Sequence, residues 1–201
     1  MPTEPREPRS DRLSGLLPDH EVRRLAQQGM IHPFAEDGRA PGKISSGLQS
    51  CGYDVRLAPE LLVLHRATRY ADPKTLARWH YEPIRPDRSG RLILPPHAFA
   101  LARTVETISL PPDVAGLVLN KSTLARAGIL VHTTVLEPGW TGTITLEITN
   151  LHQVPAVLYP REGIAQVLFF RAASAPEADY PTRGGIYQNQ RAITPPTVRK
   201  K

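Results

Sequence analysis

Proline places the strongest constraint on how this chain can fold. The 201 residues include 21 prolines, about twice the ~5% share of an average protein. Proline lacks the backbone N–H donor and is excluded from helix interiors and from central strands. In this sequence the prolines recur between short apolar stretches, which leaves little room for long helices. The sequence therefore predicts a mainly β domain of short strands joined by rigid turns.

The apolar stretches show the pattern of a sandwich, jelly roll or barrel, because they are short, evenly spaced and bounded by Pro and Gly. We expect strands at residues 53–57, 61–65, 91–94, 99–105, 114–119, 130–134, 141–150, 156–159 and 164–171. A short helix is expected before them, with Val22, Leu25 and Ala26 on one apolar face. Asp19 is its predicted N-cap, and Gly29 its predicted end.

The composition divides the chain into three segments. Residues 1–15 are rich in Pro, Arg, Glu and Ser and are expected to form a disordered basic arm. Residues 16–172 carry the strand pattern and are expected to form one β domain, long enough to bury a core. Residues 173–201 lose the apolar periodicity and form a polar C-terminal tail.

The chain is basic, with 25 Lys and Arg against 19 Asp and Glu, a formal charge of 25 − 19 = +6. Such a charge suits nucleic acid, a membrane surface or a phosphorylated small molecule. Aromatic residues make up only 6% and are not interleaved with basic ones, so a nucleic-acid partner is not expected. Neither a run of about 18 apolar residues nor a signal-peptide core is found. We therefore expect a cytoplasmic protein with no membrane partner.

Cysteine is almost absent, since Cys51 is the single one. One cysteine cannot form a disulfide within the chain or a zinc site built on several thiolates. Zinc-dependent nucleobase deaminases use an H-x-E…P-C-x-x-C pattern, which this sequence does not contain. If the chain deaminates a nucleobase, we expect it to do so without zinc.

The clearest strand, at residues 143–149, alternates apolar and polar side chains. Ile144, Leu146 and Ile148 are predicted to face the core, and Glu147 lies on the opposite, threonine-rich face. A carboxylate in the middle of a strand is most often a solvated surface residue, because carboxylates are rarely buried. The alternation alone leaves both a surface role and a functional role open for Glu147.

A second informative stretch lies at residues 120–128. Ser122 or Thr123 can cap a short helix that Gly128 ends. A helix N-terminus offers free N–H groups to phosphate oxygens, and Lys121 and Arg126 would add charged donors. An ordinary capped turn between two strands explains the same residues equally well.

The order and spacing of these stretches resemble the dCTP deaminase family. The resemblance covers about residues 16–192 and departs from the family at Ile186, where a Lys is common. The segment 132–137 is also shorter than in many relatives, and Glu137 stands where one branch of the family has Asp. The matching motifs are CGYDVRL at 51–57, KSTLAR at 121–126, VHTT at 131–134, EPGWTG at 137–142, TLE at 145–147, GIAQ at 163–166 and YQNQ at 187–190.

The resemblance implies a distorted β jelly roll or β-barrel of the dUTP diphosphatase type, assembled as a homotrimer with active sites between subunits. It implies a dCTP deaminase, an enzyme that hydrolyses dCTP to dUTP and ammonia in pyrimidine deoxynucleotide biosynthesis. Mg²⁺ would be carried on the nucleotide triphosphate, and dTTP is a candidate inhibitor. The polar tail would be a lid that orders over the bound triphosphate.

The resemblance also assigns roles to residues. Glu147 would be the catalytic acid/base, and Ser122 and Arg126 would orient water and steady charge beside it. No residue is assigned to a protein-bound metal, and for His132 a part in feedback inhibition and a structural role are both open. The implied nucleotide-binding set is Lys121, Ser122, Thr123, Leu124, Ala125, Arg126, Thr134, Val135, Thr145, Leu146, Glu147, Gln166, Tyr180 and Gln190.

Deamination without zinc requires a carboxylate in a dry pocket, which takes a proton from water and returns it to the base and the leaving amine. Burial would raise the pKa of Glu147 and suit it to both steps. One alternative is a dUTP diphosphatase, or a bifunctional enzyme that deaminates dCTP and then releases dUMP and pyrophosphate, with Glu137 as base. A non-enzymatic nucleotide-sensing or nucleic-acid-binding module would instead show salt-dependent binding without catalysis.

Overall fold

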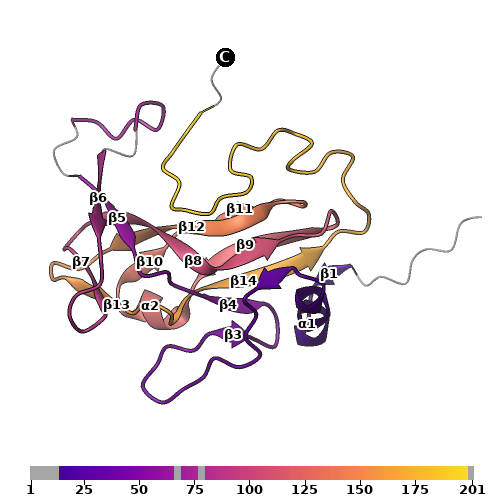
Figure 1. Cartoon of the computed structure of the whole chain (residues 1–201), viewed down its shortest axis with the longest axis horizontal. Helices are drawn as coiled ribbons and strands as arrows, with labels where there is room; N and C mark the ends of the chain where they lie inside the picture. Colours follow the sequence, from indigo (N-terminus) through magenta and orange to yellow (C-terminus); the bar gives the residue numbers. More distant parts are fainter. Residues whose placement is uncertain (1–13, 66–68, 77–79, 199–201) are drawn as a thin grey trace, which may run out of the picture.

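Two antiparallel β-sheets make up most of the computed structural model, which describes residues 14–65, 69–76 and 80–198 (Figure 1). The first sheet has the order β11-β9-β14-β4-β3, with β1 paired to β14. The second has the order β10-β12-β8-β5-β6, with β2 paired to β8, and a separate pair joins β7 to β13. Of the predicted arm, residues 1–13 lie outside the described residues.

The strands of the first sheet are β1 (Gly15–Leu16), β3 (Gly47–Leu48), β4 (Tyr53–Arg56), β9 (Val114–Asn120), β11 (Thr134–Leu136) and β14 (Gly163–Arg171). Those of the second are β2 (Ile31–His32), β5 (Leu61–Leu64), β6 (Tyr81–Ile84), β8 (Phe99–Ser109), β10 (Ile129–Val131) and β12 (Thr141–Asn150). The small pair consists of β7 (Leu92–Leu94) and β13 (Ala156–Leu158).

One hydrophobic core fills the space between the two large sheets. Leu146 and Ile148 of β12 belong to the same buried cluster as Val118 of β9 and Val167 and Phe169 of β14. Burying each such side chain stabilises the fold by roughly 1.5–3 kcal/mol. The predicted alternation of β12 is confirmed, since its apolar residues point into this core while Glu147 points to the other face.

The two sheets remain open, so the part of the prediction that named a closed β-barrel is wrong. The first sheet ends at β3 and β11, and the second ends at β6 and β10. The predicted strand at 130–134 is in fact two strands, because the chain leaves β10 after Val131 and crosses to the first sheet as β11. The crossing is held by a hydrogen bond from the His132 amide to the Glu147 carbonyl, 2.9 Å long.

Within the described residues, two helices interrupt the β structure, α1 (Asp19–Gln27) and α2 (Ser122–Arg126). The predicted buried face of α1 is confirmed. Asp19, however, is the first helical residue and not the cap, because Pro18 occupies the N-cap position and is held by a bridge to Cys51. Lys121 likewise precedes α2 without any side-chain cap bond, so neither Ser122 nor Thr123 caps that helix.

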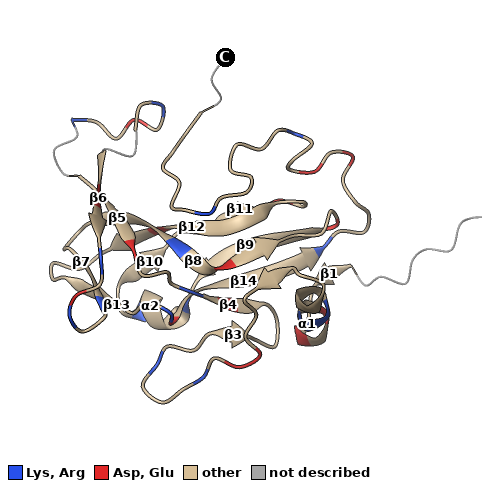
Figure 2. Cartoon of the chain, in the orientation of Figure 1, with Lys and Arg blue, Asp and Glu red and all other residues tan. Residues whose placement is uncertain are grey.

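The C-terminal tail, residues 173–198, crosses back over the second sheet (Figure 1). Its backbone forms a parallel bridge from Gln190 to Gly142 of β12. Lys and Arg are spread over separate elements with Asp and Glu among them (Figure 2). Within the described part of the chain, neither helix has the length and apolar character of a membrane span.

Candidate active site

A pocket of about 330 Å³ lies between the tail and strands of both large sheets, β6, β8 and β12 of the second and β11 of the first. Strand β6 supplies one lining residue, β8, β11 and β12 supply most of the floor, and the tail supplies the cover. The lining residues are Tyr81, Phe99, Leu101, Thr134, Val135, Leu136, Glu137, Trp140, Ile144, Thr145, Glu147, Tyr180, Tyr187, Gln190, Thr194 and Pro196.

Glu147 is the carboxylate that β12 presents to this pocket. Burial raises the pKa of Glu147, and only its own backbone opposes that rise by hydrogen bonding. Within the described residues it forms no ion pair. A half-buried carboxylate without a cationic partner keeps a proton at higher pH than an exposed one, which suits it both to accept and to return a proton.

The tail covers the pocket through hydrogen bonds to β12 and to the turn before it. The Asn189 amide donates to the Thr141 carbonyl (2.7 Å), and the Thr143 amide donates to the Gln190 carbonyl (2.8 Å). The Thr145 hydroxyl donates to Oε1 of Gln190 (3.1 Å). These bonds and the isolated bridge at Gln190 hold the tail against one end of β12, over the face that carries Glu147.

Two further contacts fix the same cover. The indole N–H of Trp140 donates to the Tyr187 carbonyl (2.9 Å), and the Tyr187 amide donates to the Tyr180 hydroxyl (3.0 Å). Both tyrosines thereby keep their rings at the pocket wall. Residues of the C-terminal tail therefore form part of the pocket wall.

The α2 group of predicted site residues lies elsewhere. Ser122 and Arg126 are exposed on α2 and do not line the pocket. Lys121 forms an ion pair with the buried Asp54. Burial raises the pKa of Asp54, and the Lys121 ammonium opposes that rise. The predicted proximity of Glu147 to Ser122 and Arg126 is therefore not found within one chain.

The remaining predicted site residues also form two groups, those that line the pocket and those that do not. The pocket brings together Thr134, Val135, Thr145, Glu147, Tyr180 and Gln190. Thr123 and Ala125 are exposed on α2 and Leu124 is buried beneath it, while Gln166 lies on β14, opposite Asp54 in the strand register. The side chain of Leu146 is fully buried in the core, on the side of β12 away from the pocket.

His132 does not line the pocket. Its Nε2 lies 3.0 Å from the Thr149 hydroxyl, and its ring meets Phe99 edge-on with centroids 6.2 Å apart. Phe99 does line the pocket, so His132 supports one wall from outside.

Sequence reasoning missed the wall formed by Tyr81, Phe99 and Leu101. Phe99 and Leu101 alternate on a predicted strand, so their common face was readable from the sequence, but nothing indicated that Glu147 shares it. Tyr81 belongs to β6, which was not predicted because Pro83 interrupts it. Burial raises the pKa of Tyr81, and the nearby charge of Glu147 adds to the rise.

Protein ligands for a metal are not gathered at the pocket. Within residues 14–65, 69–76 and 80–198, no three His, Cys, Asp or Glu side chains lie close enough together to hold an ion. The lining itself contributes two carboxylates, Glu137 and Glu147, with no His or Cys.

Comparison with known proteins gives a consistent result. The family model described as dCTP deaminase-like matches residues 16–172. A dCTP deaminase from Gluconobacter oxydans is 43% identical, over 91% of this chain and 99% of the relative. One from Pseudomonas aeruginosa (strain UCBPP-PA14) is 46% identical, over 89% of this chain and 96% of the relative.

A solved structure shares the fold. The 2′-deoxycytidine 5′-triphosphate deaminase from Agrobacterium tumefaciens superposes with a TM-score of 0.62 at 20% identity, over 80% of this chain. This chain spans about half of that one, 49% of its length. With a family match across most of the sequence and relatives above 40% identity, the chain belongs to the dCTP deaminase-like family.

Proposed function

We propose that this chain is a dCTP deaminase, which hydrolyses dCTP to dUTP and ammonia with Glu147 as the acid/base. The observation that carries the proposal is the environment of Glu147. Its carboxylate lies in a covered pocket lined by aromatic and hydroxyl side chains, and burial raises its pKa. A carboxylate with these properties can move protons in both directions during one turnover.

The reaction needs only water and proton transfers. Glu147 takes a proton from a water molecule as its oxygen bonds to C4 of cytosine, and the proton passes to N3. Glu147 then takes the proton of the new hydroxyl and delivers it to the amine. The C4–N bond breaks, ammonia leaves, and a C4 carbonyl remains. Each transfer is one that a carboxylate with a raised pKa performs better than an ordinary one.

The triphosphate needs cations that the pocket lining does not contain, because none of the lining residues is Lys or Arg. Exposed Arg126 and the exposed start of α2 are suited to phosphate oxygens. We infer that α2 of a second copy, in a homotrimer, brings Ser122 and Arg126 to the pocket of its neighbour. Ser122 would then hold the attacking water, and Arg126 would stabilise charge on the pyrimidine.

Magnesium, which the family resemblance implies, finds no cage of protein carboxylates among the described residues. The residues present fit a metal bound to the nucleotide and not to the protein. When bound, Mg²⁺ would neutralise part of the triphosphate charge.

A second candidate activity is cleavage of the triphosphate after deamination. Glu137 lines the same pocket and is exposed, so it can act as a base toward water at phosphorus. A bifunctional enzyme would release dUMP and pyrophosphate, and dTTP, if it inhibits, would compete for the same pocket.

One assay separates these functions. The purified chain is incubated with dCTP and Mg²⁺, and ammonia, dUTP, dUMP and pyrophosphate are quantified. We expect ammonia and dUTP in equal amounts. Pyrophosphate without ammonia would refute the deaminase, and pyrophosphate that disappears in Glu137→Gln would establish the bifunctional reaction.

Glu147→Gln tests the assigned base. The amide cannot accept the proton of water, so ammonia release should fall by about 10²-fold or more, while dCTP still binds. Glu177→Gln, at an exposed position in the tail outside the pocket, is the matched control. A Glu147→Gln enzyme with wild-type turnover would remove the basis of the mechanism.

A further inference from the structure

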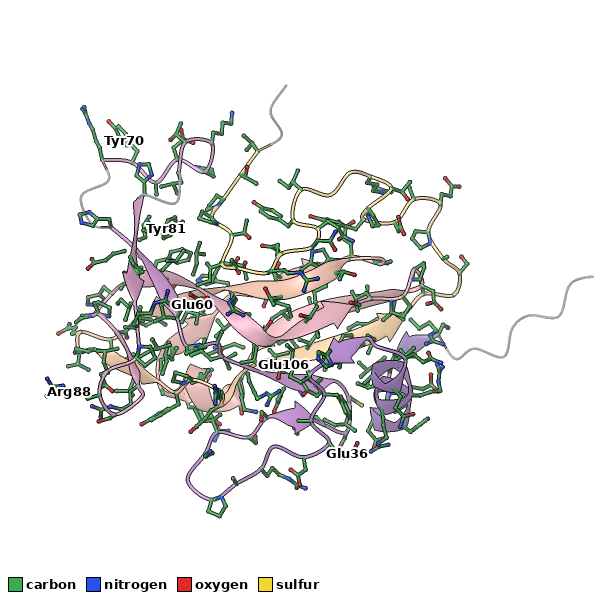
Figure 3. The ribbon with its side chains drawn as sticks, viewed as in Figure 1. Glu36, Glu60, Tyr70, Tyr81, Arg88 and Glu106 are labelled. Atoms are coloured by element: carbon green, nitrogen blue, oxygen red, sulfur yellow. The ribbon has the colours of Figure 1, made fainter. Side chains whose placement is uncertain are left out.

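A second, smaller hydrophobic cluster lies on the outer face of the second sheet. Its buried members are Leu62 of β5, Tyr81 of β6, Leu101 of β8 and Ile193 of the tail. Figure 3 labels Tyr81, at the start of β6 and on the side of the sheet where the tail descends. Ile193 is only 7% exposed, although the tail around it is polar and largely exposed. A single apolar anchor therefore holds this part of the tail.

The anchor, Ile193, lies between two contacts of the tail with β12, one at Gln190 and one at Thr194. After Gln190 the chain leaves β12, and the Thr194 amide returns to donate to the Thr145 hydroxyl (3.3 Å). Thr194 and Pro196 then form part of the pocket wall. Without Ile193 in its cluster, only hydrogen bonds near solvent would hold this stretch, and each such bond contributes little net stability.

Tyr81 belongs both to the anchor and to the pocket. It shares the buried cluster with Ile193 and lines the same cavity as Glu147. Removing the ring would open one wall and loosen the cover together. Within the described residues its hydroxyl has no hydrogen-bond partner, so the contribution is that of the ring.

We propose that Ile193 and Tyr81 are positioning residues of the deamination site, which clamp the tail over Glu147 and keep bulk water from its carboxylate. The inference deepens the proposed function and rests on it. Neither residue needs to touch the reacting atoms. Their effect is to exclude water, which strengthens electrostatic interactions inside a site, and to maintain the desolvation that raises the pKa of Glu147.

Few other charged groups of the described residues lie where they could oppose this desolvation of Glu147. On β8, Arg103 lies opposite Thr145 and is paired with Glu60 by a 2.7 Å contact. On β10 and β12 no titratable group other than Glu147 faces the pocket, and His132 follows β10 outside it. The titratable groups that share the lining are Glu137, Tyr81, Tyr180 and Tyr187, and Arg191 lies exposed on the tail beside Gln190.

The clamp is tested without reference to activity by hydrogen exchange on the full-length protein. In Ile193→Ala, the amides of Asn189 and Thr143, which bond across the tail contact, should exchange ~30-fold faster or more, as expected for deleting a buried Ile side chain. The amide of Ile148, deep in β12, should not change. Val198→Ala removes an exposed apolar group from the same tail and serves as the control. Unchanged exchange at Asn189 in Ile193→Ala would overturn the clamp.

The positioning role is tested by the pH dependence of kcat. An open tail hydrates Glu147 and lowers its pKa toward the ordinary value, so the acid limb of the kcat profile should move to lower pH as kcat falls. Tyr81→Phe keeps the ring, so the tail amides should stay protected from exchange and the acid limb of kcat should stay at its wild-type pH. In Tyr81→Ala the amides should lose that protection, and the acid limb should move to lower pH. A tail that opens while kcat and the acid limb stay at wild-type values would refute the role.

The proposed function and the clamp can be refuted independently of each other. If the wild-type chain releases no ammonia from dCTP, the proposed function is wrong, and the exchange experiment still decides the clamp. If ammonia is released but Ile193→Ala behaves like Val198→Ala in exchange, only the clamp is wrong.

Discussion

The buried ion pair between Arg56 and Glu106 should make a large contribution to stability that depends on pH. The Glu106 side chain is fully buried, and the Arg56 side chain is 23% exposed. Nε of Arg56 donates to Oε1 of Glu106 over 2.6 Å, the Arg56 amide donates to Oε2 over 2.9 Å, and Nη2 reaches the Pro33 carbonyl. Figure 3 labels Glu106 near the centre of the view, where the strands lie. The substitution Arg56→Met keeps most of the volume and removes the charge.

The magnitude follows from what remains in the variant. Removing one partner of a buried ion pair destabilises a protein by about 3–5 kcal/mol, because the other charge is left unpaired. Here the backbone amide of residue 56 still donates to Glu106, so the lower end of that range, about 3 kcal/mol near neutral pH, is expected.

The direction of the pH dependence follows from the pKa of Glu106. Burial raises that pKa, and the bonds from Arg56 oppose the rise. A folded-state pKa above the unfolded value adds stability at low pH, and this contribution is lost as the pH rises through the folded-state pKa. Without the guanidinium the pKa rises further, so the deficit of Arg56→Met should be small near about pH 5 and largest near about pH 8.

Urea unfolding followed by circular dichroism, at one fixed protein concentration, measures the effect at both pH values. The double variant Arg56→Met/Glu106→Gln removes the buried charge and should regain much of the lost stability at the higher pH. A deficit that grows as the pH falls, or a double variant no better than Arg56→Met there, would show that the pair is not the source of the effect.

Three other predictions concern single positions. At pH values above the ordinary Glu pKa, Glu147→Gln should raise the free energy of unfolding, because it removes a carboxylate whose pKa burial raises. Thermal melts at two pH values check this, and equal shifts of the melting temperature at both would contradict it. Asn150→Ala should destabilise the fold by about 2–3 kcal/mol, since the fully buried side chain donates to the carbonyls of Leu94, Pro95 and Val154. Chemical unfolding measures the loss, and a loss under about 0.5 kcal/mol would contradict the prediction. Gly128→Ala should destabilise the fold by about 1–2 kcal/mol, because the position has φ +64° and a Cβ there would lie 2.3 Å from the His152 ring. Removing that ring with His152→Ala should recover part of the loss. If nothing is recovered, backbone strain is the only cause.

The sequence predicted the elements whose pattern is local. The period of two in β12 placed Leu146 in the core and Glu147 on the opposite face without knowledge of any neighbour. The apolar face of α1 was equally readable. The crossing after Val131 was not, because residues 130–134 read as one strand and only tertiary pairing sends their two halves to different sheets.

The parts of the site that escaped prediction depend on contacts distant in sequence. Tyr81 reaches the pocket because β6 pairs with β5, and nothing in the residues around Pro83 indicates that pairing. Ile193 is one of a few scattered apolar residues in a polar tail, and their spacing shows no periodicity. The position of Ser122 and Arg126 outside the pocket was not readable either, since motif order along a sequence does not give distances in the folded chain.

Strand β12 carries core residues and Glu147 at alternate positions, and this has a consequence for how the gene can change. A substitution at one position affects one face only, but inserting or deleting one residue before Glu147 would turn that carboxylate into the core and Leu146 or Ile148 into the pocket. The fold therefore tolerates a change of residue in β12 more readily than a change in the length of the strand. Insertions are better tolerated in exposed loops away from the paired strands, where no register is at stake.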